Sequence, residues 1–239
     1  MAIAEGGRLA GRVSGDSTVA YAWAYAMAAE TMTGTVLPAR ARWLRALALE
    51  RERIANHLGD LGYLGNDGGL AFGLAQFMRL KEDVLRLNAR LFPHRYLMDW
   101  IIPGGMAAVM NDTVRADIVA QCDRLENEVR VLREIYDEHA GLQDRFLTCG
   151  RLPPETAATL GVVGLAGRAS RQTRDLRVTP GYSPYDAIGP RIVTHRNGDV
   201  AARVSVRFEE IFESLRLIRV MQERMPGGGI FEPLPAVGA

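Results

Sequence analysis

The sequence predicts a mainly α-helical protein: a bundle of long, hydrophobic helices with one small irregular, partly extended insert. Apolar residues recur at helical spacing over several long stretches. Glycines and prolines gather between these stretches, above all between Leu142 and Asp199. No internal repeat or low-complexity block is present, and 239 residues are enough for one large core. We therefore expect residues 1–239 to form a single domain.

The first helix is predicted to follow the polar cluster Ser14, Asp16 and Ser17, any of which can cap it, and to run to about Thr31. Large side chains alternate with alanines in this stretch, which is the period of a strand: Tyr21, Trp23, Tyr25 and Met27. The length and the alanine content favour a helix instead. Because the stretch is almost uncharged, we expect the other helices to enclose it.

Two further helices are predicted before residue 92. Pro38 suits the first turn of one, which runs to about Leu64 and ends at the turn Asn66–Gly69. Its inward stripe is Leu44, Leu47, Ile54, Leu58 and Leu61. The next helix spans about Leu70–Leu91, with Phe72, Phe77, Leu80, Val84 and Leu87 on one side.

An irregular apolar segment, Pro93–Gly105, precedes the fourth long helix. Asn111 or Asp112 is expected to cap this helix, which runs to about His139. Its inward stripe is Ile118, Cys122, Leu125, Val129, Leu132 and Tyr136. We interpret Cys122 as a small core residue and not as a nucleophile.

The insert and the last helix complete the chain. Pro153-Pro154-Glu155 opens a short helix, and Ile192–His195 is predicted to form a short strand before the turn Asn197–Asp199. The last helix is predicted over Val200–Met225, with the inward stripe Val204, Phe208, Ile211, Leu215 and Ile218. The tail Pro226–Ala239 is glycine, proline and small apolar residues, so we expect it to be loosely held.

Composition excludes several functional classes. Twenty-nine basic and 28 acidic residues give a net charge of +1, which argues against nucleic acid or an anionic membrane as the main partner. Uncharged runs are too short for a direct membrane span, and Met1–Arg12 does not have the pattern of a signal peptide. The two cysteines, Cys122 and Cys149, are too few and too far apart for a disulfide scaffold or a four-thiolate metal site.

Glu50, Arg53 and His57 lie three and four residues apart, so they share one helix face. A buried ladder of these groups can hold a proton near neutral pH. An ion pair within the helix next to a hydrogen-bonded core histidine explains the same spacing, and both interpretations stay open.

A second candidate is the polar stretch Arg168–Arg177, which contains four arginines and Asp175. It can bind an anion, pair with carboxylates of a partner, or be a solvated loop. The sequence has neither a nucleophile motif nor a phosphate-binding loop, so we predict no catalytic residue in this chain.

Short fragments in a fixed order carry further information: Arg12-Val-Ser14-Gly-Asp16-Ser17, Leu37-Pro38-Ala39-Arg40, Glu50-x-x-Arg53-x-x-x-His57, Gly104-Gly105, Arg168-Ala-Ser170, Asp175-x-Arg177, Pro184-Tyr185, Gly198-Asp199-Val200, Arg203-x-x-x-Arg207 and Glu213-Ser214. This series resembles the large subunit of nickel–iron hydrogenases and the 49 kDa (D) subunit of respiratory complex I. The stretches Glu52–Gly62 and Ala71–Leu91 resemble the branch of formate-hydrogenlyase and other membrane-bound, group 4-type hydrogenases. The resemblance implies a long-helix bundle of the hydrogenase large subunit type.

Departures from the family pattern matter for chemistry. The first Cys-x-x-Cys pair of the hydrogenases falls on Ser14 and Ser17, and a serine hydroxyl does not replace a soft thiolate ligand. The second pair and the N-terminal β-rich portion of the family have no counterpart, so we expect a partial large-subunit core, no metal and no hydrogen activation. The quinone-binding tyrosine of complex I falls near Gly15. A histidine that the family places beside the terminal iron–sulfur cluster falls at Leu97.

The resemblance then implies a function and a set of residues. It implies a nickel-free, large-subunit-like component of a complex I-like or membrane-bound hydrogenase-like oxidoreductase; the alternative is a non-catalytic assembly scaffold or a truncated remnant. We expect no cofactor bound by this chain alone, with a quinone at its interface with an iron–sulfur subunit. The residues implied for that cavity or interface are Arg12, Ser14, Asp16, Ser17, Glu50, Arg53, His57, Arg168 and Asp175.

Partners and location follow from the same resemblance. We expect an iron–sulfur small subunit and membrane subunits as partners, no nucleic acid, and a cytoplasmic position at the inner membrane held through these subunits. The family docks its iron–sulfur protein near Ser14–Tyr21 and Arg168–Arg177. We therefore expect exposed apolar surface there and dependence on a partner for solubility.

Overall fold

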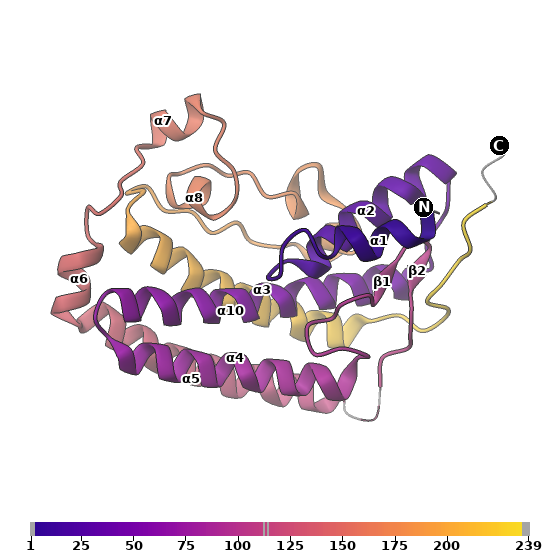
Figure 1. The fold of residues 1–239 in the computed structure, drawn as a ribbon, viewed down its shortest axis with the longest axis horizontal. Coiled ribbons are helices and arrows are strands. Elements are labelled where there is room, and N and C mark those ends of the chain that lie inside the picture. Colours follow the sequence, from indigo (N-terminus) through magenta and orange to yellow (C-terminus); the bar gives the residue numbers. More distant parts are fainter. Residues whose placement is uncertain (1–2, 112, 114, 236–239) are drawn as a thin grey trace. The chain divides into compact units, whose positions relative to one another are not determined.

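The computed structural model describes residues 3–111, 113 and 115–235, and these fold mainly into helices (Figure 1). This result confirms the predicted mainly α class. The longer helices are α1 (Ile3–Ala10), α2 (Thr18–Thr33), α3 (Ala39–Asp67), α4 (Ala71–Leu91), α5 (Ala116–Glu138) and α10 (Val200–Arg224). The shorter elements are strands β1 (Ile101–Ile102) and β2 (Gly105–Met106), helices α6 (Ala140–Phe146), α7 (Pro154–Thr159), α8 (Gly164–Ala169) and α9 (Tyr185–Ile188), and the helical turn η2 (Arg177–Gly181).

The described residues form two compact units, which we treat separately. Unit 1 takes its residues from Met1–Arg53, Asp83–Ala120 and Ile218–Ala239. Unit 2 consists of Ile54–Glu82 and Gln121–Leu217. Helices α3, α4, α5 and α10 each contribute one part to each unit. The single domain expected from the sequence stays a prediction.

The predicted long helices lie close to their expected positions, except that α5 begins later than expected. Helix α1 was not predicted. Helix α5 begins at Ala116, so Asn111 does not cap it; the Asn111 side chain instead accepts a hydrogen bond from the amide of Thr113 at 3.1 Å. Asp112, the other predicted cap, lies outside the described residues.

In unit 1, helix α1 packs along α2 beside the β1–β2 hairpin (Figure 1). Gly6 permits this contact, because a Cβ atom there would lie 2.2 Å from the Tyr25 hydroxyl. Helix α2 buries Trp23 but leaves Tyr21 and Met27 43% and 39% exposed. Helix α2 is therefore buried at Trp23, as expected, but it is not enclosed along the face that carries Tyr21 and Met27.

A buried ion pair joins three elements of unit 1. The Arg45 guanidinium donates to both carboxylate oxygens of Glu30, at 3.0 and 2.6 Å, and to the carbonyl of Ile102 at 2.7 Å. The Glu30 carboxylate also accepts from the amide of Gly104 at 2.8 Å. Helices α2 and α3 are thus tied to the hairpin by groups that hydrogen-bond one another, which is the condition for burying charge.

The tail after α10 is hydrogen-bonded to this hairpin. Met106 donates to the carbonyl of Ile230 at 2.9 Å, and Glu232 donates to the carbonyl of Gly104 at 2.8 Å. A Cβ atom on Gly104 or Gly105 would lie 2.2 or 2.0 Å from a tail carbonyl. The prediction of a loosely held tail is therefore wrong for this part, because its backbone groups find partners on the hairpin.

In unit 2, the Tyr136 ring lies at the centre of the packed helices. It meets Phe77 of α4 and Phe208 of α10 with ring centroids 5.4 and 5.7 Å apart, and its hydroxyl donates to the carbonyl of Leu61 on α3 at 2.8 Å. Phe72 was predicted on the inward side of α4 but is 49% exposed. The predicted stripes of α5 and α10 are buried, including Cys122.

The insert of unit 2 contains the short elements α7, α8, η2 and α9. The predicted strand Ile192–His195 does not form. Instead, the His195 amide donates to the carbonyl of Arg168 at 2.8 Å, and the His195 carbonyl accepts from the amide of Arg171 at 2.7 Å. Asp199 caps α10 by accepting from the amide of Ala202 at 2.8 Å. The insert is thereby fastened to the first turn of α10.

Candidate functional site

The residues predicted for a cavity or interface fall into two groups. One group belongs to unit 1: Arg12, Ser14, Asp16, Ser17, Glu50 and Arg53. The other group belongs to unit 2: His57, Arg168 and Asp175. We describe the geometry of each group by itself.

In unit 1, Arg12 lies in an ion pair with Asp99. Its two terminal nitrogens donate to the two carboxylate oxygens at 2.7 and 2.8 Å. The hydrogen bond from Arg12 lowers the pKa of Asp99, although burial opposes this shift. Arg12 also donates to the carbonyl of Arg8 at 2.6 Å. The segment Arg12–Ser17, which connects α1 to α2, is called the serine loop below. The Arg12 guanidinium fixes the beginning of this loop.

The serine loop leads into α2 without capping it. Ser14 and Ser17 are partly buried and Asp16 is exposed. Ser17 stands at the cap position, but its side chain makes no capping hydrogen bond. The carboxylate of Glu52 on α3 accepts from the amides of Val19 and Ala20 instead, at 2.7 and 3.1 Å. The predicted serine or aspartate cap is wrong, because a carboxylate brings two acceptor oxygens to this helix end.

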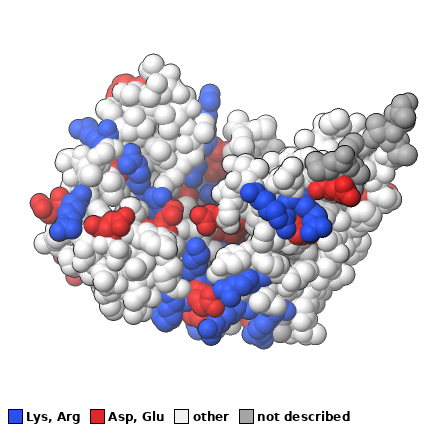
Figure 2. Space-filling view, viewed as in Figure 1, with Lys and Arg blue, Asp and Glu red and all other residues white. Residues whose placement is uncertain are grey.

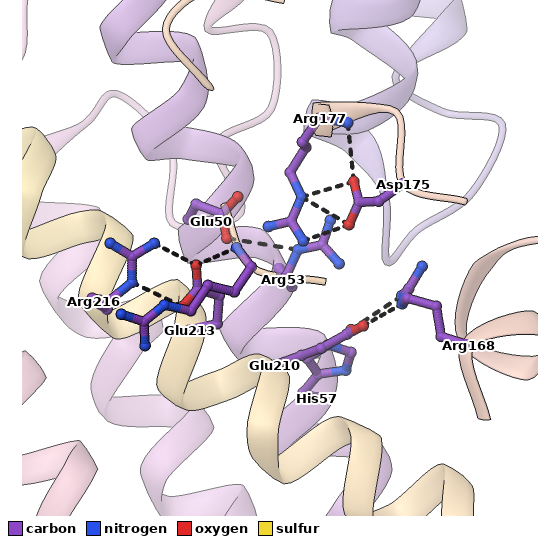
Figure 3. A network of polar contacts seen from close by, with 10 residues as sticks. Glu50, Arg53, His57, Arg168, Asp175, Arg177, Glu210, Glu213 and Arg216 are labelled. Atoms are coloured by element: carbon purple, nitrogen blue, oxygen red, sulfur yellow. Dashed lines mark hydrogen bonds and ion pairs between the residues drawn. The ribbon is translucent and has the colours of Figure 1, made fainter. Parts of the chain in front are cut away.

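The predicted face of α3 divides between two kinds of contact (Figure 3). The Glu50 side chain is fully buried and lies 3.6 Å from the Nε of Arg53, which is an ion pair within the helix. The His57 ring is buried and hydrogen-bonds Glu210 of α10. This arrangement agrees with the interpretation of an ion pair next to a hydrogen-bonded histidine.

In unit 2, the Glu210 carboxylate lies between the His57 ring and the Arg168 guanidinium (Figure 3). His57 Nε2 lies 2.8 Å from Glu210 Oε2, and Arg168 Nη2 lies 3.1 Å from the same oxygen. Arg168 Nε donates to Oε1. Burial raises the pKa of Glu210, but the hydrogen bonds and charges of His57 and Arg168 lower it further than burial raises it, so its net pKa lies well below the ordinary value. Glu210 is therefore a permanent buried anion at neutral pH.

A second buried pair in unit 2 joins Asp175 and Arg177. Arg177 Nη2 donates to Asp175 Oδ2 at 2.7 Å, and the Arg177 amide donates to Oδ1 at 2.9 Å. The Arg177 guanidinium also lies over the Tyr185 ring, 5.8 Å from its centroid. Asp175 and Arg177 thus stabilise a local turn of the insert by pairing with each other.

The arginine-rich stretch of the insert has two parts. Arg168 and Arg177 are buried in the ion pairs just described, whereas Arg171 and Arg174 are exposed. Leu176, beside them in the chain, is 72% exposed. In Figure 2, acidic and basic side chains are intermixed on the visible face. Arg171, Arg174 and Leu176 are therefore the residues of this stretch whose exposure would allow contact with an anion or a partner protein.

Two acidic residues of these clusters were missed from the sequence. Glu210 stands one turn before Ser214 on the buried side of α10, where a charged residue is a signal that a partner is needed. Glu52 stands on α3 between Glu50 and Arg53, and no sequence signal relates it to α2. The pairing of both residues depends on contacts between distant segments.

The described side chains show little that could hold a metal. Among them, no group of three or more histidine, cysteine, aspartate or glutamate residues lies close enough to bind an ion. Cys122 is buried and Cys149 is exposed, each as a free thiol. A surface groove of about 330 Å³ between α4 and α5 is lined by Phe72, Gln76, Arg79, Asn127, Glu128, Val131, Leu132 and Ile135, none of which belongs to the predicted site. Each helix in the described part of the chain is too short or too polar to span a membrane.

Solved structures define the class of fold. A chain of the membrane-bound sulfane sulfur reductase, an archaeal respiratory membrane complex, superimposes with a TM-score of 0.90 at 23% identity, over 96% of this chain and 62% of that one. The fold is thus that of a subunit known from a respiratory membrane complex. The profile of the family described as respiratory-chain NADH dehydrogenase, 49 Kd subunit, matches residues 67–237, and the chain belongs to this family.

Curated relatives come from both branches that the sequence resembles. A subunit of the NADH-quinone oxidoreductase of Thermosipho melanesiensis is 29% identical over 88% of this chain and 57% of its own length. Formate hydrogenlyase subunit 5 of Escherichia coli is 29% identical over 92% of this chain and 39% of its own length. The carbon monoxide-induced hydrogenase of Rhodospirillum rubrum is 29% identical over 89% and 60%. The chain thus spans from about two fifths to three fifths of the length of these relatives.

Proposed function

We propose that this chain is a nickel-free, large-subunit-like component of a membrane-bound oxidoreductase of the complex I or membrane-bound hydrogenase type. In this proposal it packs on an iron–sulfur small subunit, and the serine loop helps to shape a cavity for a quinone or a related electron acceptor. Membrane subunits of the complex hold the chain at the cytoplasmic face of the inner membrane. Membership of the 49 kDa family and the names of the relatives support this assignment.

The observation that carries the proposal is the pair of serine hydroxyls on the serine loop. Ser14 and Ser17 stand where the resemblance places a thiolate pair. The nickel–iron site of hydrogenases needs soft, ionised ligands such as thiolates. A serine hydroxyl near neutral pH is neither soft nor ionised, so Ser14 and Ser17 do not fit these metals. A hydroxyl donates well to a carbonyl oxygen, and a quinone has two such oxygens. Among the described residues neither hydroxyl hydrogen-bonds the protein, which leaves both for a ligand.

The buried charges support a working component over a remnant. Keeping Glu210, His57 and Arg168 out of water costs desolvation energy, and well-packed apolar residues can replace such clusters without loss of stability. A chain that had lost its role would be under no constraint to keep these groups buried and paired. The scaffold or remnant alternative predicts no effect of the serine loop on any electron transfer.

Metal content and complex formation test the assignment. The chain is co-expressed with the iron–sulfur protein of the same gene cluster, and the purified complex is analysed for iron and nickel. We expect the two proteins to elute together, with iron in the partner and no stoichiometric nickel. Nickel in a one-to-one ratio, or hydrogen evolution, would overturn the proposal. A monodisperse monomer without affinity for the partner would favour the remnant alternative.

Quinone reduction tests the role of the serine loop. The double variant Ser14→Ala with Ser17→Ala should raise the KM for a short-chain quinone and leave complex formation unchanged. A matched control, Thr156→Ala on α7, removes a hydroxyl far away in the sequence and should leave KM unchanged. Equal kinetics in all three proteins would contradict the role given to the two serines.

A further inference from the structure

Glu52 occupies the two amides that a capping serine would use. Ser17 is the cap residue of α2, because its carbonyl accepts a hydrogen bond from the Tyr21 amide at 3.1 Å and so begins the helix. The side chain of a serine at this position ordinarily accepts from the amide of the second or third helical residue. In α2 these residues are Val19 and Ala20, and both amides donate to the Glu52 carboxylate, at 2.7 and 3.1 Å. Glu52 and Ser17 therefore compete for the same donors.

The conformation of Ser17 agrees with this competition. Its φ of −134° and ψ of 39° lie outside the extended region that capping residues usually adopt, and its side chain makes no capping hydrogen bond. A carboxylate offers two acceptor oxygens, and the positive N-terminal end of a helix favours a negative acceptor over a neutral hydroxyl. Glu52 thus holds the amides, and the Ser17 hydroxyl has no part in stabilising the helix end.

The position of Ser14 depends on that of Ser17. The Ser17 amide donates to the carbonyl of Ser14 at 3.3 Å, which closes the end of the serine loop as a turn. Helix α2 has no acidic residue in its own first turn that could replace Glu52 as the acceptor. The contact between α3 and the first turn of α2 therefore places both serines.

We propose that Glu52 is a positioning residue for the serine loop: by holding the amides of Val19 and Ala20, it keeps the Ser17 hydroxyl out of the cap and available to a carbonyl oxygen of the ligand. The inference rests on the proposed function, in which that ligand is a quinone. Without Glu52 the two amides lose their acceptor, and Ser17 turns inward to cap α2, as serines at this position ordinarily do. The carboxylate acts on the ligand only through Ser17.

A double-mutant cycle in urea unfolding of the full chain tests the competition without a partner protein or a quinone. In the unaltered chain, Ser17→Ala removes no capping hydrogen bond, so it should change the unfolding equilibrium constant by less than about twofold. In Glu52→Ala, where Ser17 caps α2, the same substitution should raise that constant about fivefold. Equal effects of Ser17→Ala in the two backgrounds would overturn the proposal.

The matched control for the cycle is the background Glu126→Ala. This substitution also removes a partly buried carboxylate, which pairs with Arg130 on α5. Ser17→Ala should have the same small effect in this background as in the unaltered chain. A fivefold effect here would show that the serine responds to any loss of stability and not to the loss of Glu52, which would also overturn the proposal.

Amide hydrogen exchange covers the case in which Glu52→Ala does not fold. In Ser17→Ala with Glu52 intact, the amides of Val19 and Ala20 should keep their protection factors to within about twofold, because Glu52 remains their acceptor. A loss of protection of about tenfold would show that the Ser17 hydroxyl already caps the helix, and the positioning role would be wrong.

Quinone kinetics of the complex with the iron–sulfur protein separate this inference from the proposed function. Glu52→Ala and Ser17→Ala should each raise the KM for a short-chain quinone about fivefold at unchanged kcat. The double variant should raise it no further, because both substitutions remove the same hydroxyl contact. A lower kcat or a loss of complex formation in Glu52→Ala would mean a merely structural role and overturn the inference. An unchanged KM in Ser17→Ala, with the unfolding cycle as expected, would contradict the quinone site and leave the competition for the amides supported.

Discussion

Glu210 and Glu30 show how this protein tolerates charge away from water. Each carboxylate accepts two hydrogen bonds from one arginine, and each has a further partner, His57 for Glu210 and the amide of Gly104 for Glu30. Buried ion pairs of this kind add little to the free energy of unfolding when compared with apolar residues of the same size. The loss of one partner, however, leaves the other groups buried and unpaired, which is strongly destabilising. Single substitutions at these carboxylates should therefore have large effects.

Glu210→Gln should lower the free energy of unfolding by about 3 kcal/mol or more, because the buried Arg168 guanidinium loses its counter-charge and His57 loses the carboxylate that it hydrogen-bonds. Urea unfolding monitored by circular dichroism measures the change. Glu209→Gln is the matched control: its carboxylate pairs with Arg133 and is 42% exposed, so the cost should stay below about 1 kcal/mol. Equal costs for the two variants would show that the buried cluster does not stabilise the fold.

Acid should weaken the protein partly through Glu210. The pKa of this group is lower in the folded chain than its ordinary value of 4.5, so its stabilisation is present above pH 4.5 and is lost as the pH falls toward the lower folded pKa. The free energy of unfolding, measured at decreasing pH below 4.5, should fall more steeply in the unaltered chain than in Glu210→Gln. Parallel curves would mean that the pKa of Glu210 is not lowered by folding.

Helices α3, α4, α5 and α10 were predictable, because each carries a long apolar stripe at helical spacing. Helix ends were less predictable. The N-terminus of α2 takes its cap from Glu52 on another helix, and no local pattern contains that information. The hairpin was missed because its strands have two residues each, and the hydrogen bonds of the tail come from more than 100 residues away.

The turn before α10 depends on one glycine. Gly198 has a φ of +69°, and a Cβ atom there would lie 1.9 Å from the carbonyl oxygen of Leu152. Gly198→Ala should therefore lower the free energy of unfolding by about 3 kcal/mol or more, because the substitution adds both backbone strain and a clash with the Leu152 carbonyl. Gly161→Ala has the same strain at a φ of +62° but meets no atom within 4 Å, so it should cost about 1 kcal/mol. Thermal unfolding of both variants measures the difference, and similar costs would contradict the role of the close approach.

For the chain as a whole, the resemblance identified the family. It also gave candidate site residues, but the side chains that these residues contact could not be derived from the sequence. His57 and Glu210 are 153 positions apart, and only the folded chain brings them together. Arg168 and Arg177 look like neighbours of Arg171 and Arg174 in the sequence, yet the first two are buried and the last two are exposed. The exposed pair is therefore what a partner protein can contact.

The last prediction concerns that contact and rests on the proposed function. Charges at the rim of an interface steer association, so Arg174→Glu should weaken binding of the iron–sulfur protein roughly tenfold, mainly by slower association at low salt. Arg124→Glu makes the same charge change on an exposed position of α5 and is the matched control. Surface plasmon resonance at two salt concentrations separates the two variants. If both weaken binding equally, the effect is one of net charge; if neither does, the partner contacts another surface and the arginine stretch of the insert is a solvated loop.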